Sequence, residues 1–324
     1  MRRLALRIKA GVFWLSAMAG VVVFLLRGRR PKPGLAILCY HRIAENLPAG
    51  SPHDPYNVSP KQFARQLDAL QSLSSVRVVS VAEVAEWVKT GSTPPGSYLL
   101  LTFDDGYQNT LAAARQLQSR GMGGIFFLST GYMDRPTFEC NLYDQWCQEL
   151  PDANPLWYRP LTWDDCRSLT GMGMDLQPHG HWHRLVGQLE RKDMEEEILL
   201  SKQAVESTLG CQVKAYAYAG GSGYLNHYNA QVEEFLSQAG FCFALSTDAG
   251  TNPPDWIKGN AFHLRRLPVH EHDGGLFFQA KIAGYSGPLP ALKSVVHRIR
   301  TRLTFSPTKT PGRSGTHDKE DQAN

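Results

Sequence analysis

Short apolar runs alternate with stretches of helical periodicity between residues 35 and 269. The apolar runs predict strands at residues 35–41, 76–81, 97–103, 123–130, 174–176, 214–220, 241–247 and 263–269. Apolar positions at helical spacing predict helices at residues 59–70, 81–91, 109–121, 162–173, 190–210 and 229–240. Because strands that alternate with helices pair in parallel through right-handed crossovers, we expect an α/β fold, a distorted (β/α)7 barrel over residues 33–285.

The segment before this domain, residues 1–32, contains 17 uncharged residues from Ala10 to Leu26. A helix of this length would extend about 25 Å, enough for a thin bilayer. We therefore predict an uncleaved membrane anchor. Two alternatives remain: a signal peptide cleaved near "AMA" at residues 17–19, and a helix lying in the membrane plane. Four Lys or Arg residues lie on each side of the run, so charge does not decide its orientation.

The chain has 324 residues and a net charge of +4, but the charge is divided unevenly. Residues 1–32 carry eight basic residues and no acidic residue, and residues 286–324 carry a net charge of +4. Residues 33–285 therefore carry a net charge of −8. An acidic domain of this kind argues against nucleic acid as a substrate.

The C-terminal segment, residues 286–324, differs from the domain before it. Residues 291–303 place apolar side chains on one helical face and Arg and Lys on the other. Such a helix can lie on an anionic membrane surface or pack on the barrel. Residues 306–324 are polar, and we expect them to be disordered.

Six cysteines show no spacing typical of a zinc site. If the domain faces the periplasm, a Cys140–Cys147 disulfide is possible, and free buried thiols are the alternative.

Asp104 and Asp105 end the predicted strand at residues 97–103, and Gly106 follows them. In barrels of this type the chemistry lies at the carboxyl ends of the strands. Two adjacent carboxylates repel each other and raise one pKa unless a cation lies nearby. A divalent metal on one carboxylate would leave the other free to act as a base.

Three histidines, His179, His181 and His183, follow the predicted strand at residues 174–176. The i,i+4 spacing of His179 and His183 can place two imidazoles on one side of a turn. Together with one aspartate they would supply three ligands and leave a position for water, which is typical of hydrolytic metal sites.

These motifs resemble those of the polysaccharide deacetylases, the NodB-homology group of carbohydrate esterase family 4. The shared features are "TFDDGY" followed by H-x-x-x-H, in this order and spacing. "LAILCYHRI", "VSPKQFARQLDAL", "LTWDDCRSLTGMGMDLQPHGHWHRL", "GFCFALSTDAG" and "HLRRLPV" also resemble segments of the branch that includes bacterial poly-N-acetylglucosamine deacetylases. The resemblance covers roughly residues 35–270.

The resemblance implies a role for each matching residue. Asp105, His179 and His183 match the metal ligands, whereas His181 is not expected to be one. Residues matching the catalytic groups are Asp104 as general base, the backbone N–H of Tyr107 as oxyanion donor, His41 as the acid for the leaving amine, and Arg266 as the partner of Asp104. Expected sugar contacts are Tyr40, Trp163 and Tyr218. The implied cofactor is a divalent metal, zinc first, with cobalt, nickel or iron as alternatives.

One segment departs from the family pattern. Relatives have a proline and an aromatic residue before a glycine in the third motif, where this chain has Ala219 and Gly220 in "AYAGGSGY". We therefore expect a more flexible loop and a more open sugar pocket.

These features together predict a metal-dependent enzyme that removes N-acetyl groups from an extracytoplasmic polysaccharide. It would be anchored in the bacterial inner membrane, with the catalytic domain in the periplasm or outside the cell. Alternatives are a deacetylase of a lipid-linked sugar at the membrane and a catalytically silent glycan-binding protein.

Overall fold

The computed structural model describes residues 15–45, 56–136 and 159–285. The strands in this part of the chain are β1 (Gly34–Tyr40), β2 (Arg42–Ile43), β3 (Asn57–Val58), β4 (Val76–Val78), β5 (Ser97–Phe103), β6 (Ile125–Leu128), β7 (Asp175–Pro178), β8 (Ala215–Ala217), β9 (Phe243–Ala249) and β10 (Leu264–Pro268). The helices with full bounds are α2 (Pro60–Gln71), α3 (Val81–Thr90), α4 (Leu111–Gln118), α6 (Trp163–Gly171), α7 (Arg191–Leu209), α8 (Ala230–Gln238), α9 (Pro254–Gly259) and α10 (Gly275–Ile282).

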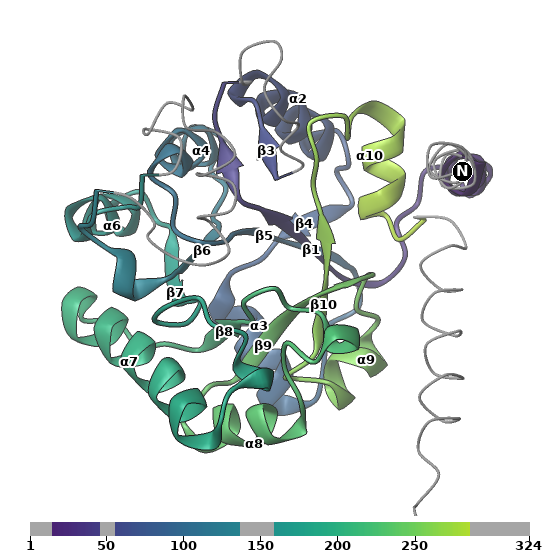
Figure 1. The fold of residues 1–324 in the computed structure, drawn as a ribbon. Coiled ribbons are helices and arrows are strands. Elements are labelled where there is room, and N and C mark those ends of the chain that lie inside the picture. The colour runs from purple at the N-terminus through teal and green to yellow at the C-terminus, as the bar shows by residue number, and fades with distance from the viewer. Residues whose placement is uncertain (1–14, 46–55, 137–158, 286–324) are drawn as a thin grey trace, which may run out of the picture. The chain divides into compact units, whose positions relative to one another are not determined.

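The main sheet follows the order β7-β6-β5-β1-β10-β9-β8, with every pair of neighbouring strands parallel. Strand β4 pairs with the first half of β5, and β6 pairs with its last two residues. The strands curve into a nearly closed barrel with helices around it (Figure 1). The predicted distorted (β/α)7 barrel is therefore confirmed.

The two ends of the sheet, β7 and β8, meet through side chains. Within the described residues no backbone ladder joins them. Gln177 of β7 accepts hydrogen bonds from the backbone N–H groups of Lys214 and Ala215, both 2.9 Å long. The Nδ1 atom of His179 lies 2.8 Å from the carbonyl oxygen of Ala217. The candidate metal ligand His179 therefore lies at the closing seam of the barrel.

Residues alternate between two faces along each strand, as strand geometry requires. On β1, Ala36, Leu38 and Tyr40 belong to the core cluster beneath the outer helices. Leu35 and Ile37 belong to the other cluster, together with residues of α3 and α9. Cys39 continues this second set, so its side chain shares the face that looks into the barrel.

Helix starts follow the sequence signals where a capping side chain is present. Ser59 caps α2 by accepting from the N–H of Gln62, and Ser80 forms a reciprocal capping box with Glu83 on α3. Helices α9 and α10 were not predicted. α9 begins at the second residue of a Pro-Pro pair, Pro253 and Pro254, which is typical of a turn. α10 ("GLFFQAKI") is too apolar throughout to show a polar face.

The chain is helical over residues 15–26, within the predicted anchor. Val21 and Phe24 are buried against Leu73, Ala280 and Ala283 of the domain. The opposite side exposes apolar side chains, among them Leu26 at 81%. No helix within residues 15–45, 56–136 and 159–285 combines the length and the apolar character needed to span a bilayer.

Several sequence predictions fall outside the described residues. These are the first part of the predicted anchor (residues 10–14), the Cys140–Cys147 disulfide, the basic helix at residues 291–303 and the tail at residues 306–324.

Candidate metal and catalytic centre

Asp104 is the first residue after β5, and its carboxylate is buried between a cation and an imidazole. Its Oδ1 atom accepts a 2.6 Å hydrogen bond from Nη1 of Arg266, which is itself fully buried. Its Oδ2 atom lies 3.8 Å from Nε2 of His179. Burial alone would raise the pKa of Asp104, but Arg266 and His179 outweigh it and the pKa is lowered. Asp104 is therefore ionised at neutral pH, as a general base requires.

Arg266 is fixed from a second direction. Its Nε atom donates a 2.9 Å hydrogen bond to the carbonyl oxygen of Ser246 on β9. Leu264, two residues earlier on β10, belongs to the cluster inside the barrel, and Arg266 reaches Asp104 from the same strand. The predicted partner of Asp104 therefore reaches it from two strands away across β1, in a single orientation.

Asp105 has a backbone conformation that is rare outside glycine. Its φ angle is +75°, and that of Gly106 is +83°. In a regular strand Asp105 would point to the face opposite Asp104. The left-handed turn instead directs it to the same end of the barrel, where its Oδ1 atom lies 3.3 Å from Nε2 of both His179 and His183. Burial would raise the pKa of Asp105, but the neighbouring histidines hold it well below its usual range.

These three donor atoms suit a divalent metal. One carboxylate oxygen and two imidazole nitrogens converge from Asp105, His179 and His183, and all three residues are buried. The second nitrogen of His179 is engaged with the Ala217 carbonyl, which leaves Nε2 as the metal-facing atom. A set of one oxygen and two nitrogens is typical of a catalytic zinc site with a position for water, and cobalt, nickel and iron accept the same donors.

The turn that carries His183 is held by Glu197 of α7, a residue that the sequence analysis did not select. Oε1 of Glu197 accepts hydrogen bonds from the N–H groups of Trp182 (2.7 Å) and Arg184 (3.1 Å), one on each side of His183. His183 has a φ angle of +55°, so this turn needs such support. One sequence feature could have indicated this role: Glu197 lies on the apolar side of a predicted helix, between Met194 and Ile198.

Gly180 allows the Glu197 side chain to come close to the turn that carries His183. A β-carbon at residue 180 would lie 2.7 Å from Oε1 of Glu197, and its φ angle is +89°. His181 points elsewhere, with Nδ1 2.9 Å from the hydroxyl of Thr130. It is not part of the group formed by Asp105, His179 and His183.

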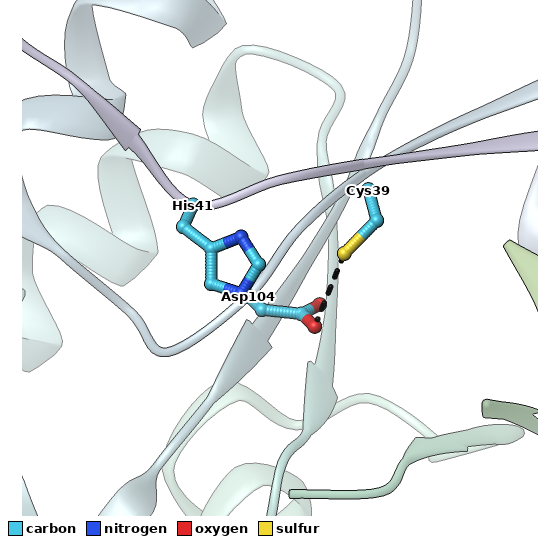
Figure 2. A group of neighbouring side chains, drawn as sticks. All are labelled: Cys39, His41 and Asp104. Carbon is cyan, nitrogen blue, oxygen red and sulfur yellow. Dashed lines mark hydrogen bonds between the residues drawn. The ribbon is translucent and has the colours of Figure 1, made fainter. Parts of the chain in front are cut away.

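His41 and Cys39 face Asp104 from the end of β1 (Figure 2). Donor atoms of the three residues lie within 4.8 Å of one another. The Cys39 thiol donates to Oδ2 of Asp104 at 3.5 Å. Burial lowers the pKa of His41, although the charges of Asp105 and Asp104 oppose this effect. Burial raises the pKa of Cys39 well above its usual range, so the thiol is protonated in the absence of a metal.

Tyr107 follows the aspartate turn and is fully buried. Its backbone bridges Pro160, and the guanidinium of Arg42 lies over its ring. Tyr107 therefore directly follows the left-handed turn of Asp105 and Gly106, two residues after the candidate ligand Asp105.

Three aromatic residues expected to contact sugar lie in different settings. Tyr40 and Tyr218 are fully buried, with their hydroxyls donating to Gln66 and to the carbonyl of Phe262. Tyr218 also stacks on Tyr228 with ring centroids 4.1 Å apart. Trp163 is half-buried against the core. The structure therefore places Tyr40 and Tyr218 in the core, so a stacking role for them has no support in this geometry.

The altered third motif is held in place by hydrogen bonds. Thr247 donates from its hydroxyl to the carbonyl of Gly220 and from its N–H to the carbonyl of Gly221, both at 2.7 Å. A β-carbon at residue 220 would lie 2.4 Å from Nδ1 of His227. His227 therefore occupies the space that a side chain at residue 220 would need, while the expected flexibility of this loop stays a prediction.

Comparison with known proteins gives one family match for part of the chain. Residues 91–244 match the family model described as polysaccharide deacetylase. No curated protein matches significantly.

Several solved structures have the same fold as this chain and match it over most of its length. The chain is 22% identical to IcaB from Ammonifex degensii, with a TM-score of 0.61 over 79% of this chain and 98% of that one. It is 20% identical to the deacetylase PplD of Streptococcus pyogenes, with a TM-score of 0.60 over 75% and 95%. A de-N-acetylase from Aggregatibacter actinomycetemcomitans matches at 15% identity and a TM-score of 0.58, over 76% and 99%. Residues 91–244, which contain the aspartate pair and the histidine motif, therefore match the polysaccharide deacetylase family, and the chain shares the fold of these solved structures.

Proposed function

We propose that this protein is a metal-dependent hydrolase that removes N-acetyl groups from the amino sugars of an extracytoplasmic polysaccharide and releases acetate. The observation that carries the proposal is that the two adjacent aspartates have different partners. The carboxylate of Asp105 contacts the imidazoles of His179 and His183. The carboxylate of Asp104 is instead paired with Arg266 and lies next to this group. The match of residues 91–244 to the polysaccharide deacetylase family supports the same reaction class.

Each residue would contribute a separate step. A metal held by Asp105, His179 and His183 would supply Lewis acidity and lower the pKa of water at the site. Asp104, ionised and oriented by Arg266, would accept the proton of the attacking water. The N–H of Tyr107 would donate to the oxyanion. His41 would give a proton to the sugar nitrogen as the bond to the acetyl carbon breaks, which yields acetate and a free amine.

The direct test is acetate release by the full-length protein in detergent. The substrates are N-acetylglucosamine oligomers, assayed with and without a chelator and again after zinc is restored. We expect release that the chelator abolishes and zinc recovers. If the zinc-loaded protein releases no acetate from any oligomer or lipid-linked sugar in the panel, the proposed reaction is refuted.

One observation favours the lipid-linked sugar as an alternative substrate. The helical residues 15–26 pack on the catalytic domain through Val21 and Phe24 and expose Leu26 and other apolar side chains. A membrane anchor attached in this way would keep the domain close to the bilayer. Faster acetate release from a lipid-linked N-acetylated sugar than from a soluble oligomer of the same sugar would favour this substrate.

A further inference from the structure

The carboxyl ends of β1 and β5 present a second group of metal-ligating side chains. It consists of Cys39, His41 and Asp104, whose donor atoms all lie within 4.8 Å of one another (Figure 2). Cys39 and Asp104 are buried, and His41 is half-buried. The proposed reaction employs His41 and Asp104 and gives Cys39 no part.

We propose that Cys39, His41 and Asp104 form a second cation site, which binds a thiophilic divalent ion such as Cd²⁺ or excess Zn²⁺. A thiolate, an imidazole and a carboxylate are ligands that zinc takes in proteins. Ligands in a tetrahedral zinc site lie about 3.5 Å apart. The Cys39 sulfur and the Asp104 Oδ2 atom already have this separation, 3.5 Å.

The two groups of ligands are distinct in composition. Asp105, His179 and His183 offer oxygen and nitrogen only, and they share no residue with the Cys39 group. Because a thiolate prefers softer ions, Cd²⁺ should select the Cys39 site, and Mg²⁺ should not occupy it. The groups approach to 3.8 Å between Oδ2 of Asp104 and Nε2 of His179, so ions at both sites would be close neighbours.

The surrounding charges permit a second ion. Arg266 occupies Oδ1 of Asp104, which leaves Oδ2 facing Cys39. On binding, the thiol releases its proton to solvent, so the ion and the thiolate together add one positive charge. Because Arg266 already balances Asp104 and the first ion would lie on Asp105, the second ion should bind more weakly than the first.

Occupation of this site would inhibit the enzyme, an effect that rests on the proposed function. The ion would take the oxygen of Asp104 that is not bonded to Arg266 and the imidazole nitrogen of His41. Since the base and the acid would then both be blocked, we expect activity to rise with the first ion bound and to fall by at least about 100-fold with the second.

The experiment is a cadmium titration of the full-length protein followed by the ultraviolet thiolate-to-cadmium absorption band and by bound metal. The variants are Cys39→Ser and, as a matched control, Cys166→Ser, which changes a buried thiol on α6. We expect Cys39→Ser to lose part of the band and one bound ion, and Cys166→Ser to lose neither. A band unchanged by Cys39→Ser would overturn the proposal.

An Asp105→Asn variant separates the two sites. It should lose the ion held with His179 and His183 and keep the band due to Cys39. Loss of that band as well would show a single shared site and would also overturn the proposal. If the Cys39 band and ion are present but no acetate is ever released, the second site stands and the proposed function fails.

A measurement on the unchanged protein guards against variants that misfold. Anomalous diffraction from crystals soaked in cadmium should show a peak bonded to the Cys39 sulfur, separate from a peak at Asp105. Absence of the Cys39 peak at saturating cadmium would refute the site.

Discussion

At the scale of single residues, the adjacent aspartates have different surroundings because the backbone turns between them. Asp104 continues the inward face of β5, where it meets Arg266 from β10. Asp105 adopts a left-handed conformation and joins the imidazoles. A residue with φ near +75° costs roughly 1–2 kcal/mol in strain. The interactions of its carboxylate offset this cost.

The roles of the two aspartates can be separated by amide substitution. Asp104→Asn should keep one equivalent of zinc and lower kcat by at least about 100-fold, because the amide cannot accept the proton. Asp105→Asn is the control, since asparagine tolerates a left-handed backbone but is a weaker ligand. It should lose zinc at unchanged fold, as measured by metal analysis and circular dichroism. Full turnover of Asp104→Asn would exclude Asp104 as the base.

The sequence indicates the candidate ligands and the candidate base more clearly than it indicates their surroundings. Asp104, Asp105, His179 and His183 stand out because an adjacent pair of carboxylates and a cluster of three histidines each follow a predicted strand. The burial of Tyr40 and Tyr218 was not predicted, since alternation along a strand does not tell which face meets the helices. Cys39 showed no spacing pattern, and only the pairing of β1 with β5 brings it to Asp104.

At the scale of elements, helix α7 supports the turn that carries a metal ligand. Glu197 bonds the N–H groups on both sides of His183, so its loss should loosen the ligand. We expect Glu197→Ala to weaken zinc affinity about 10- to 100-fold, and Glu197→Gln, which keeps an acceptor oxygen, to weaken it less. Competition with a zinc-binding dye measures both. Equal zinc affinity in Glu197→Ala and the unchanged protein would contradict this role.

A second element-scale prediction concerns β9, where Asp248 accepts hydrogen bonds from Tyr228 (3.0 Å) and His263 (2.9 Å). Burial raises the pKa of Asp248, but these partners outweigh it and the pKa in the folded state is lowered. The stabilisation is therefore complete above the unfolded-state pKa, about 3.9, and is lost as the pH falls through the folded-state value.

Asp248→Asn removes this contribution. Because the carboxylate is partly exposed, the variant should be less stable by only about 1 kcal/mol at pH 6. The difference from the unchanged protein should shrink as the pH falls below about 4. Urea unfolding at a series of pH values measures it. A difference that grows toward low pH would refute the assigned sign.

At the scale of the whole molecule, the strand–helix alternation predicted the barrel but not its closure. The seam between β7 and β8 depends on the Gln177 and His179 side chains, which periodicity does not reveal. The packing of residues 15–26 against the domain was likewise not predictable from the sequence. An apolar run of 17 residues has the same appearance whether it meets lipid or protein on one side.

The described part of this helix offers a test of how far it belongs to the domain. Phe24 is fully buried, packs beside Ala280 and Ala283, and lies 5.6 Å from the ring of Tyr285. Leu26, two residues later, is 81% exposed. If residues 15–26 stabilise the catalytic domain, Phe24→Ala should lower the free energy of unfolding by about 3 kcal/mol, whereas Leu26→Ala should change it by less than about 0.5 kcal/mol.

Chemical denaturation of the full-length protein in detergent measures both free energies of unfolding. Flotation with anionic vesicles measures membrane binding by the exposed surface of the helix. Because Leu26 faces away from the domain, Leu26→Asp should weaken vesicle binding and leave the domain folded. Phe24→Ala should do the reverse: it should destabilise the domain and leave vesicle binding unchanged. Equal stability of Phe24→Ala and Leu26→Ala would mean that the helix is only tethered to the domain, because a docked helix must lose packing energy when the fully buried ring of Phe24 is removed.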